Sequence, residues 1–179
     1  MVLYYNSSHT FMYDFPTLTL AYFNRYPNPH SAHVLSTDTI STHIDAEGRL
    51  HQTKLIKKSG RLPTWVKPFL GKISTSWIIE ITMVDPKRQK LWTYCRNLDH
   101  TKVIRVEEFN EYIYKDGKME SNVKVKFSSG FKHKWAGTVK DRIEAWSQKK
   151  FRDNIEKSRM GFKLVMDGVK ERLVHQGIA

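Results

Sequence analysis

The strongest constraint on the fold of this chain is a run of strand-like segments followed by one long helical pattern. Between Val34 and Phe127 the segments are rich in Thr, Ile and Val, and several alternate apolar and polar residues. Such alternation is typical of a strand with one buried face. It is clearest where Trp77, Ile79 and Ile81 alternate with polar residues. The expected strands cover residues 2–11, 34–44, 49–57, 73–83, 89–98, 103–115 and 119–127.

Short turn sequences separate these strands and favour an antiparallel meander. Asp45-Ala46-Glu47-Gly48 is an expected turn, Asp85-Pro86 is another, and Asp116-Gly117 is a hairpin signal. We therefore expect one curved antiparallel sheet of about seven strands.

Helical patterns flank the strands. Asp14 is expected to cap a short helix that carries Pro16 in its first turn and ends near Tyr26. From about Lys134 to Val174, apolar residues recur at helical spacing and form one stripe. Internal glycines could bend or break this second helix. The chain is thus expected to be α+β, with a long C-terminal helix across the sheet and a cavity between them for an apolar ligand.

Composition indicates a soluble protein with an acidic partner. The chain of 179 residues is expected to form a single domain over residues 1–179, and its net charge is +12. Nucleic acid, an anionic membrane or an acidic protein would each suit this charge, although a basic surface can also serve solubility alone. Cys95 is the single cysteine, which excludes an internal disulfide and a cysteine-based zinc site. No apolar window is long enough to span a membrane.

The segment Lys58–Lys72 combines bulky apolar residues with basic ones. Two prolines and two glycines interrupt it, so it is not a strand. A solvated loop would not normally carry so much apolar surface. We therefore expect the segment to close a cavity or to dip into an apolar, negatively charged environment.

Three groups of polar residues are candidates for binding an anion. Trp146, Lys150, Asn154, Lys157 and Gly161 share one face of the C-terminal helix, where Lys and Asn would suit phosphate oxygens. A solvated face with extended lysines explains the same pattern.

The second group lies on and after one strand, at Lys54, Lys57, Lys58 and Arg61. Strand alternation places Lys54 and Lys58 on one side and Lys57 on the other. A charged edge strand that resists aggregation is an equally good interpretation. The third group is Arg25 and His33, which flank the rigid Tyr26–Pro29 run.

The sequence lacks the signatures of common enzymes and nucleic-acid-binding domains. It has no Walker loop, GxSxG, HExxH or GxGxxG motif, and no nucleophile is paired with a base. It has no RNA-recognition pattern and no zinc-finger spacing. A basic nucleic-acid-binding module remains an alternative that only the charge and aromatic content favour. A hydrolase or cyclase that uses the same cavity is a further alternative.

Several motifs resemble the PRELI-like family of phospholipid transfer proteins of the mitochondrial intermembrane space. They are FNRYPNP at 23–29, KKSGRLPTWVKPFL at 57–70, RNLDH at 96–100, KFSSGF at 126–131 and KSRMG at 157–161. The similarity covers nearly the whole chain and is greatest to the fungal branch that carries phosphatidic acid toward cardiolipin synthesis. The resemblance implies a START-like sheet wrapped on a long helix, with a lipid tunnel and a lid loop.

Residue roles follow from this resemblance position by position. The lipid head group would be bound by Arg25, His33, Lys58, Arg61, Lys150, Asn154 and Lys157. The lid and membrane-inserting residues would be Leu62, Trp65, Val66, Lys67 and Phe69. No catalytic residue, metal or cofactor is implied.

The resemblance also implies partners and a location. The chain would bind phosphatidic acid, anionic mitochondrial membranes and a small helical twin-CX9C protein, and would not bind nucleic acid. It would act in the intermembrane space, peripherally on the inner membrane, carrying lipid from the outer to the inner membrane. A phosphatidylserine carrier of the same fold is the alternative that the sequence leaves open.

Overall fold

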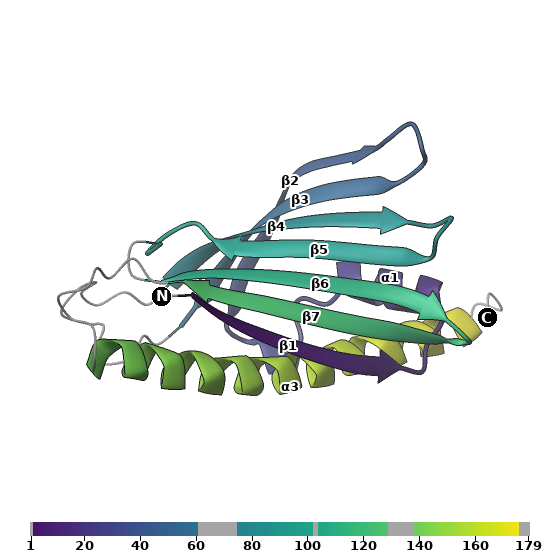
Figure 1. The fold of residues 1–179 in the computed structure, drawn as a ribbon. Helices are drawn as coiled ribbons and strands as arrows, with labels where there is room; N and C mark the ends of the chain where they lie inside the picture. Colours follow the sequence, from purple (N-terminus) through teal and green to yellow (C-terminus); the bar gives the residue numbers. More distant parts are fainter. Residues whose placement is uncertain (1, 61–74, 102–103, 129–137, 176–179) are drawn as a thin grey trace.

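The protein folds as one antiparallel sheet with helices on its inner face. The computed structural model describes residues 2–60, 75–101, 104–128 and 138–175. Within these ranges the sheet has seven strands in the order β1-β7-β6-β5-β4-β3-β2, and every neighbouring pair is antiparallel (Figure 1). The strands are β1 (Val2–Phe11), β2 (Val34–Ile44), β3 (Leu50–Ser59), β4 (Thr75–Asp85), β5 (Lys90–Asn97), β6 (Arg105–Lys115) and β7 (Lys118–Ser128). The predicted α+β class and meander are confirmed.

The first helix begins where the sequence places its capping signal. The helix α1 (Phe15–Phe23) starts at Asp14, whose Oδ1 accepts a hydrogen bond from the Thr17 amide at 2.7 Å. It ends slightly before the expected position near Tyr26, and a 3₁₀ turn, η1 (Pro29–Ser31), follows before β2. In the sequence, α1 and η1 connect β1 to β2, which are the two edge strands of the sheet. The chain segment that contains Arg25 and His33 therefore crosses the inner side of the sheet.

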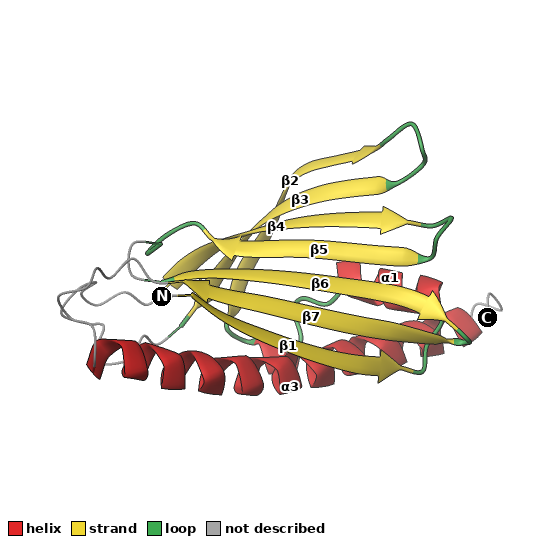
Figure 2. Ribbon diagram, in the orientation of Figure 1, coloured by secondary structure: helices red, strands yellow, loops and turns green. Residues whose placement is uncertain are grey.

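The second helix is continuous. The helix α3 (Thr138–His175) contains Gly161 and Gly168 without a break, so the possible interruption there does not occur. Figure 2 shows α3 extending along the length of β1 and β7, with α1 on the same side of the sheet. Phe162, Met166 and Val169 of α3 are buried in one cluster with residues of α1 and of five strands. Among the described residues, no helix is both long and apolar enough to cross a membrane.

In the central strands the polar side is buried and the apolar side is partly exposed, which is the reverse of what simple alternation suggests. In β4 the polar residues Glu80 and Thr82 are only 3% and 2% exposed, whereas the apolar Ile81 is 36% exposed. The alternation therefore marks a strand correctly, but its polar side faces the helices. The same holds in β5, where Thr93 is fully buried. The centre of the inner face is consequently polar.

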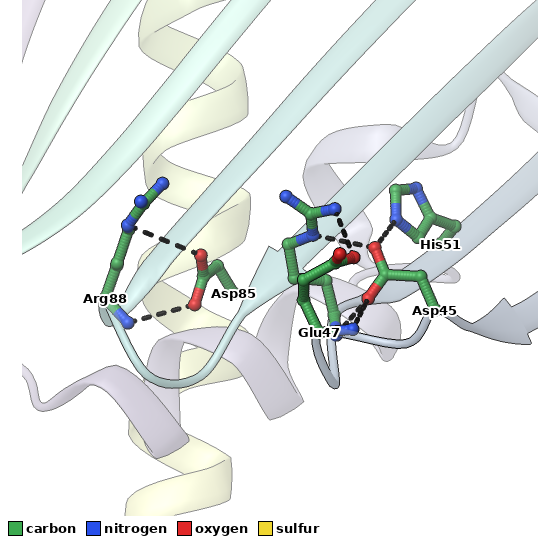
Figure 3. Close-up of polar contacts among 6 residues, drawn as sticks. Asp45, Glu47, His51, Asp85 and Arg88 are labelled. Carbon is green, nitrogen blue, oxygen red and sulfur yellow. Dashed lines mark hydrogen bonds and ion pairs between the residues drawn. The ribbon is translucent and has the colours of Figure 1, made fainter.

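The turns at the far end of the sheet are stabilised by acidic side chains. Asp45 accepts hydrogen bonds from the Arg49 guanidinium at 2.7 Å and from His51 Nε2 at 2.8 Å, and Asp85 accepts one from the Arg88 amide at 3.0 Å (Figure 3). Burial opposes ionisation of Asp45, but hydrogen bonds from the Arg49 amide, from His51 and from the Arg49 guanidinium dominate and hold its carboxyl pKa below its usual range. The turn predicted at residues 45–48 is confirmed, with Gly48 at a positive φ of 81°.

A close contact between α3 and η1 requires a glycine. A Cβ atom built on Gly161 would lie 2.7 Å from Asn28 Oδ1. The Asn28 side chain cannot easily move away, because it donates to the Arg25 carbonyl at 2.6 Å and accepts from the His30 amide at 2.9 Å. The contact therefore fixes the distance between α3 and the segment that contains Arg25 and His33.

We expect Gly161→Ala to lower stability by about 1–3 kcal/mol, because the new methyl group overpacks this contact. The matched control is Gly168→Ala in the same helix, where nothing lies within 4 Å of the new Cβ. That change should be neutral or stabilising by up to about 1 kcal/mol, from helix propensity alone. Chemical denaturation measures both free energies of unfolding. Equal effects of the two substitutions would contradict the close contact.

Candidate functional site

A buried ion pair lies at the centre of the inner face. Arg25 follows α1, and its Nη2 contacts Glu80 Oε2 of β4 in an ion pair whose side chains are 12% and 4% exposed. The same guanidinium donates to the Tyr22 carbonyl at 2.7 Å, and its carbon lies 3.9 Å from the centre of the Tyr22 ring. The pair thus connects the end of α1 to the middle of the sheet.

Burial and the neighbouring positive charges have opposite effects on the pKa of Glu80, and the effect of the charges is larger. Loss of hydration disfavours the carboxylate, but the Arg25 guanidinium and the Lys58 ammonium stabilise it and hold the pKa of Glu80 below its usual value. Glu80 Oε2 also accepts a hydrogen bond from the Cys95 thiol at 3.4 Å. Glu80 is therefore ionised at neutral pH, although it is buried.

Lys58 belongs to the same polar group. Cross-strand pairing aligns Lys54, Glu80, Cys95 and Glu108 in one row on β3 to β6, and Lys58 lies at the end of β3 on the same face. Burial alone would lower the pKa of Lys58, but the nearby Tyr26, Cys95 and the two glutamates raise it above its ordinary value. The Lys54 ammonium lies 5.5 Å from the centre of the Phe23 ring on the inner side, whereas Lys57 lies over Trp77 on the outer side. The predicted alternation of these lysines is confirmed.

His33 is influenced by Lys58 and also by two further cations, Lys150 and Lys157 of α3. Its carbonyl accepts the Ser59 amide at 2.7 Å, which fixes His33 beside the end of β3. Partial loss of hydration, followed by the positive charges of Lys58, Lys150 and Lys157, lowers the pKa of His33 from 6.5. Lys150 and Lys157 lie two turns apart on α3. Three ammonium groups from α3 and β3 therefore act electrostatically on one imidazole.

The predicted site residues fall into three sets. The structure brings His33, Lys58, Lys150 and Lys157 together, and Arg25 is joined to them through Glu80. Asn154 is exposed on α3 between Lys150 and Lys157. The remaining predicted residues, Arg61, Leu62, Trp65, Val66, Lys67 and Phe69, lie outside the described residues.

Sequence reasoning missed the polar residues of the inner face. Glu80, Cys95, Glu108 and Asn110 stand on three adjacent strands, and Asn110 donates to Glu108 at 2.8 Å. The one sequence signal was a glutamate on the polar side of an alternating strand, which alternation assigned to solvent. Four buried oxygens here have no hydrogen-bond partner among the described residues. They are Gln52 Oε1, Glu80 Oε1, Thr93 Oγ1 and Asn110 Oδ1.

The cations adjoin two apolar clusters. One contains Leu18, Tyr22 and Phe162, and the other contains Val125 and Phe127 with Trp146 and Phe151 packed against them. Within the described part of the chain, no carboxylate forms an ion pair with Lys58, Lys150 or Lys157. Unpaired ammonium groups beside apolar side chains suit a molecule with an anionic end and an apolar body.

Comparisons with known proteins identify relatives over nearly the whole chain. The model of the PRELI-like family matches residues 17–172. The chain is 49% identical to the protein named UPS1, mitochondrial, of Saccharomyces cerevisiae over 174 residues, which is 96% of this chain and 97% of that protein. It is 34% identical to the ups1 homolog of Schizosaccharomyces pombe, covering 84% of this chain and 86% of that protein.

A solved structure supports the fold at low sequence identity. The crystal structure of TTHA0849 from Thermus thermophilus superimposes with a TM-score of 0.60 at 9% identity, covering 93% of this chain and 98% of that one. This similarity concerns the fold alone. It agrees with the expected START-like arrangement of a curved sheet and a long helix.

The convergence of charges on His33 can be tested by NMR. We expect His33 to titrate below 6.5, and Lys157→Glu to raise its pKa because a cation is replaced by an anion. Lys163→Glu, an equal change of charge at an exposed position of α3, should leave the pKa of His33 nearly unchanged. A pH titration of the imidazole signals in all three proteins measures this. Equal shifts in the two variants would contradict the proximity of Lys157.

Proposed function

The chain belongs to the PRELI-like family, and on that basis we propose that it is a phospholipid transfer protein that carries phosphatidic acid between mitochondrial membranes. In this proposal lipid moves from the outer to the inner membrane and supplies cardiolipin synthesis. The protein extracts, shields and releases the lipid without changing it. It therefore acts as a carrier and not as an enzyme.

The observation that carries this proposal is that the ammonium groups of Lys58, Lys150 and Lys157 lie beside the two apolar clusters. Lys58, Lys150 and Lys157 influence one imidazole, and no carboxylate of the described chain neutralises them through an ion pair. A phosphate group supplies the missing negative charge and accepts several hydrogen bonds. A small soluble phosphate would satisfy the cations but would not use the apolar surroundings.

The apolar clusters would shield the acyl chains. Transfer of each methylene from water to an apolar environment is worth about 0.8 kcal/mol. Two long acyl chains therefore cannot cross water at useful rates unless a protein covers them. We assign this covering to the space between the sheet and α3, where Phe151 and Phe162 face the inner strands.

Each cationic residue has a role in the proposed complex. Lys58, Lys150 and Lys157 bind phosphate oxygens, Asn154 donates a further hydrogen bond, and His33 donates from an imidazole N–H. Arg61 would add a planar guanidinium to the proposed head-group site. Arg25 acts differently, because Glu80 already engages its guanidinium. It raises the positive potential below the phosphate and orients the polar group.

The predicted lid segment Lys58–Lys72 begins inside β3, to which Lys58 and Ser59 belong, so its remainder after β3 would serve as the lid. Its apolar residues Leu62, Trp65, Val66 and Phe69 would insert shallowly into the bilayer, and Lys67 would remain near the lipid head groups. The charge of +12 favours an anionic membrane surface, with about 1 kcal/mol for each Lys or Arg close to it. Opening of the lid at the membrane would then admit or release one lipid.

The proposal also assigns a location and a partner. Relatives are named as mitochondrial proteins, and we place this chain in the intermembrane space, peripheral to the inner membrane. A small helical twin-CX9C protein would bind it there as a heterodimer. Cys95 directs its thiol inward to Glu80, so the disulfides of such a complex would lie within the partner.

Reversal of one charge tests the phosphate site. We expect Lys157→Glu to reduce transfer of phosphatidic acid between vesicles at least tenfold, because an anion replaces a phosphate ligand. Lys163→Glu has the same effect on net charge and on membrane attraction, but it should retain most of the activity. Normal transfer by Lys157→Glu would remove the assigned site. Donor vesicles that contain phosphatidylserine, run in parallel, test the alternative head group.

A further inference from the structure

The inner face contains a negatively charged hydrogen-bond acceptor, Glu80, surrounded by cationic side chains. Glu80 uses Oε2 for Arg25 and Cys95, whereas its Oε1 is buried and has no hydrogen-bond partner among the described residues. A buried carboxylate oxygen without a donor is costly, so native proteins almost always satisfy it. Phosphate recognition alone does not explain this oxygen, because a fully ionised phosphate has no proton to donate.

The groups that face Glu80 define which donor can reach it. They are Tyr22 and Arg25 at the end of α1, Lys54 and Lys58 of β3, Cys95 of β5 and Tyr112 of β6, and Glu108 of β6 acts on Lys58 and Cys95 beside them. Three cations and two carboxylates leave an excess of positive charge. This excess repels an ammonium group, although an ammonium would be a good donor. It attracts an anion instead.

A ligand must therefore be an anion that also carries an acidic hydrogen. The singly protonated phosphomonoester meets both requirements, since it has one negative charge and one P–OH donor. A phosphodiester has the same charge but no P–OH. Among the described residues, one set of cations acts on His33 and another acts on Glu80. Lys58 is the one residue that belongs to both sets. A phosphate at Lys58 can thus direct a hydroxyl inward while Lys150 and Lys157 bind its other oxygens.

We propose that Glu80 Oε1 accepts a hydrogen bond from the P–OH of a phosphomonoester and thereby selects phosphatidic acid against phosphodiester lipids. The inference rests on the proposed lipid transfer function and adds a specificity-determining residue to it. Arg25 is a positioning residue in this arrangement, because its ion pair fixes the Glu80 carboxylate and leaves Oε1 available. The oxygens of Thr93 and Asn110, on the next cross-strand row, extend the acceptor surface.

The test compares two lipids within one transfer reaction. Donor vesicles contain equal amounts of phosphatidic acid and phosphatidylmethanol in phosphatidylcholine, and mass spectrometry quantifies both lipids in the acceptor vesicles. At a pH of about 5.5 a phosphomonoester whose second pKa is about 6 carries one proton, so the two lipids differ mainly in the P–OH. Wild-type protein should prefer phosphatidic acid about tenfold or more.

Glu80→Gln should bring this ratio close to one, because the charged acceptor is lost. The matched control is Glu108→Gln, which removes a carboxylate from the same row but not the proposed acceptor. It should retain the wild-type ratio. The ratio is internal to each reaction, so a reduced amount of folded protein does not alter it. If Glu80→Gln fails to fold, Glu80→Asp takes its place, because it keeps the charge but withdraws the acceptor by one methylene. The ratio should then also fall towards one.

Two results would overturn the inference. A wild-type ratio near one would show that the P–OH is not recognised. A wild-type preference that Glu80→Gln retains would show that the extra methyl group is excluded by its size. In either case, transfer of phosphatidic acid that depends on Lys157 would leave the proposed function intact. Loss of all transfer in the wild-type protein would instead contradict the function itself.

Discussion

The buried ion pair between Arg25 and Glu80 is the interaction on which the site depends. Burial of two charges costs several kcal/mol for each ion, and apolar residues of similar volume would often stabilise a core as well or better. The pair is maintained by Tyr22, whose carbonyl and ring both contact the guanidinium, and by the Cys95 thiol. Such an arrangement is difficult to explain by stability alone. It is explained if the inner face must hold charge for a ligand.

This constraint accounts for the unusual distribution of residues across the sheet. The inner side of β4 and β5 contains Glu80, Thr82 and Thr93, whereas Ile81 on the outer side of β4 is exposed. An ordinary half-solvated sheet has the opposite pattern. The apolar core lies mainly around β1, β7, α1 and α3, where Phe11, Met119 and Phe162 are buried, and Val84 and Leu91 near one end of β4 and β5 complete it. The molecule thus separates an apolar region from a polar one on the same inner face, as an amphiphilic ligand requires.

Much of the architecture could be predicted because its signals are local. Alternation, turn residues and the Asp14 cap identified the strands and α1 within a few residues. The face of β4 could not be predicted in this way, because alternation gives the period but not which side is covered. That depends on where α1 and α3 lie. The need for glycine at position 161 of α3 likewise reflects a contact with Asn28, which is distant in sequence. Glu80 was missed for the same reason: its partners Arg25 and Lys58 come from other elements.

The central claim is that this chain binds one anionic phospholipid between its sheet and α3. Native mass spectrometry of the purified protein, after incubation with vesicles of mixed phospholipids, tests it most directly. The account predicts a complex of one chain with one lipid, and phosphatidic acid as the lipid released and identified. A protein that binds no phospholipid under these conditions, or that binds neutral and anionic lipids without preference, would contradict the account.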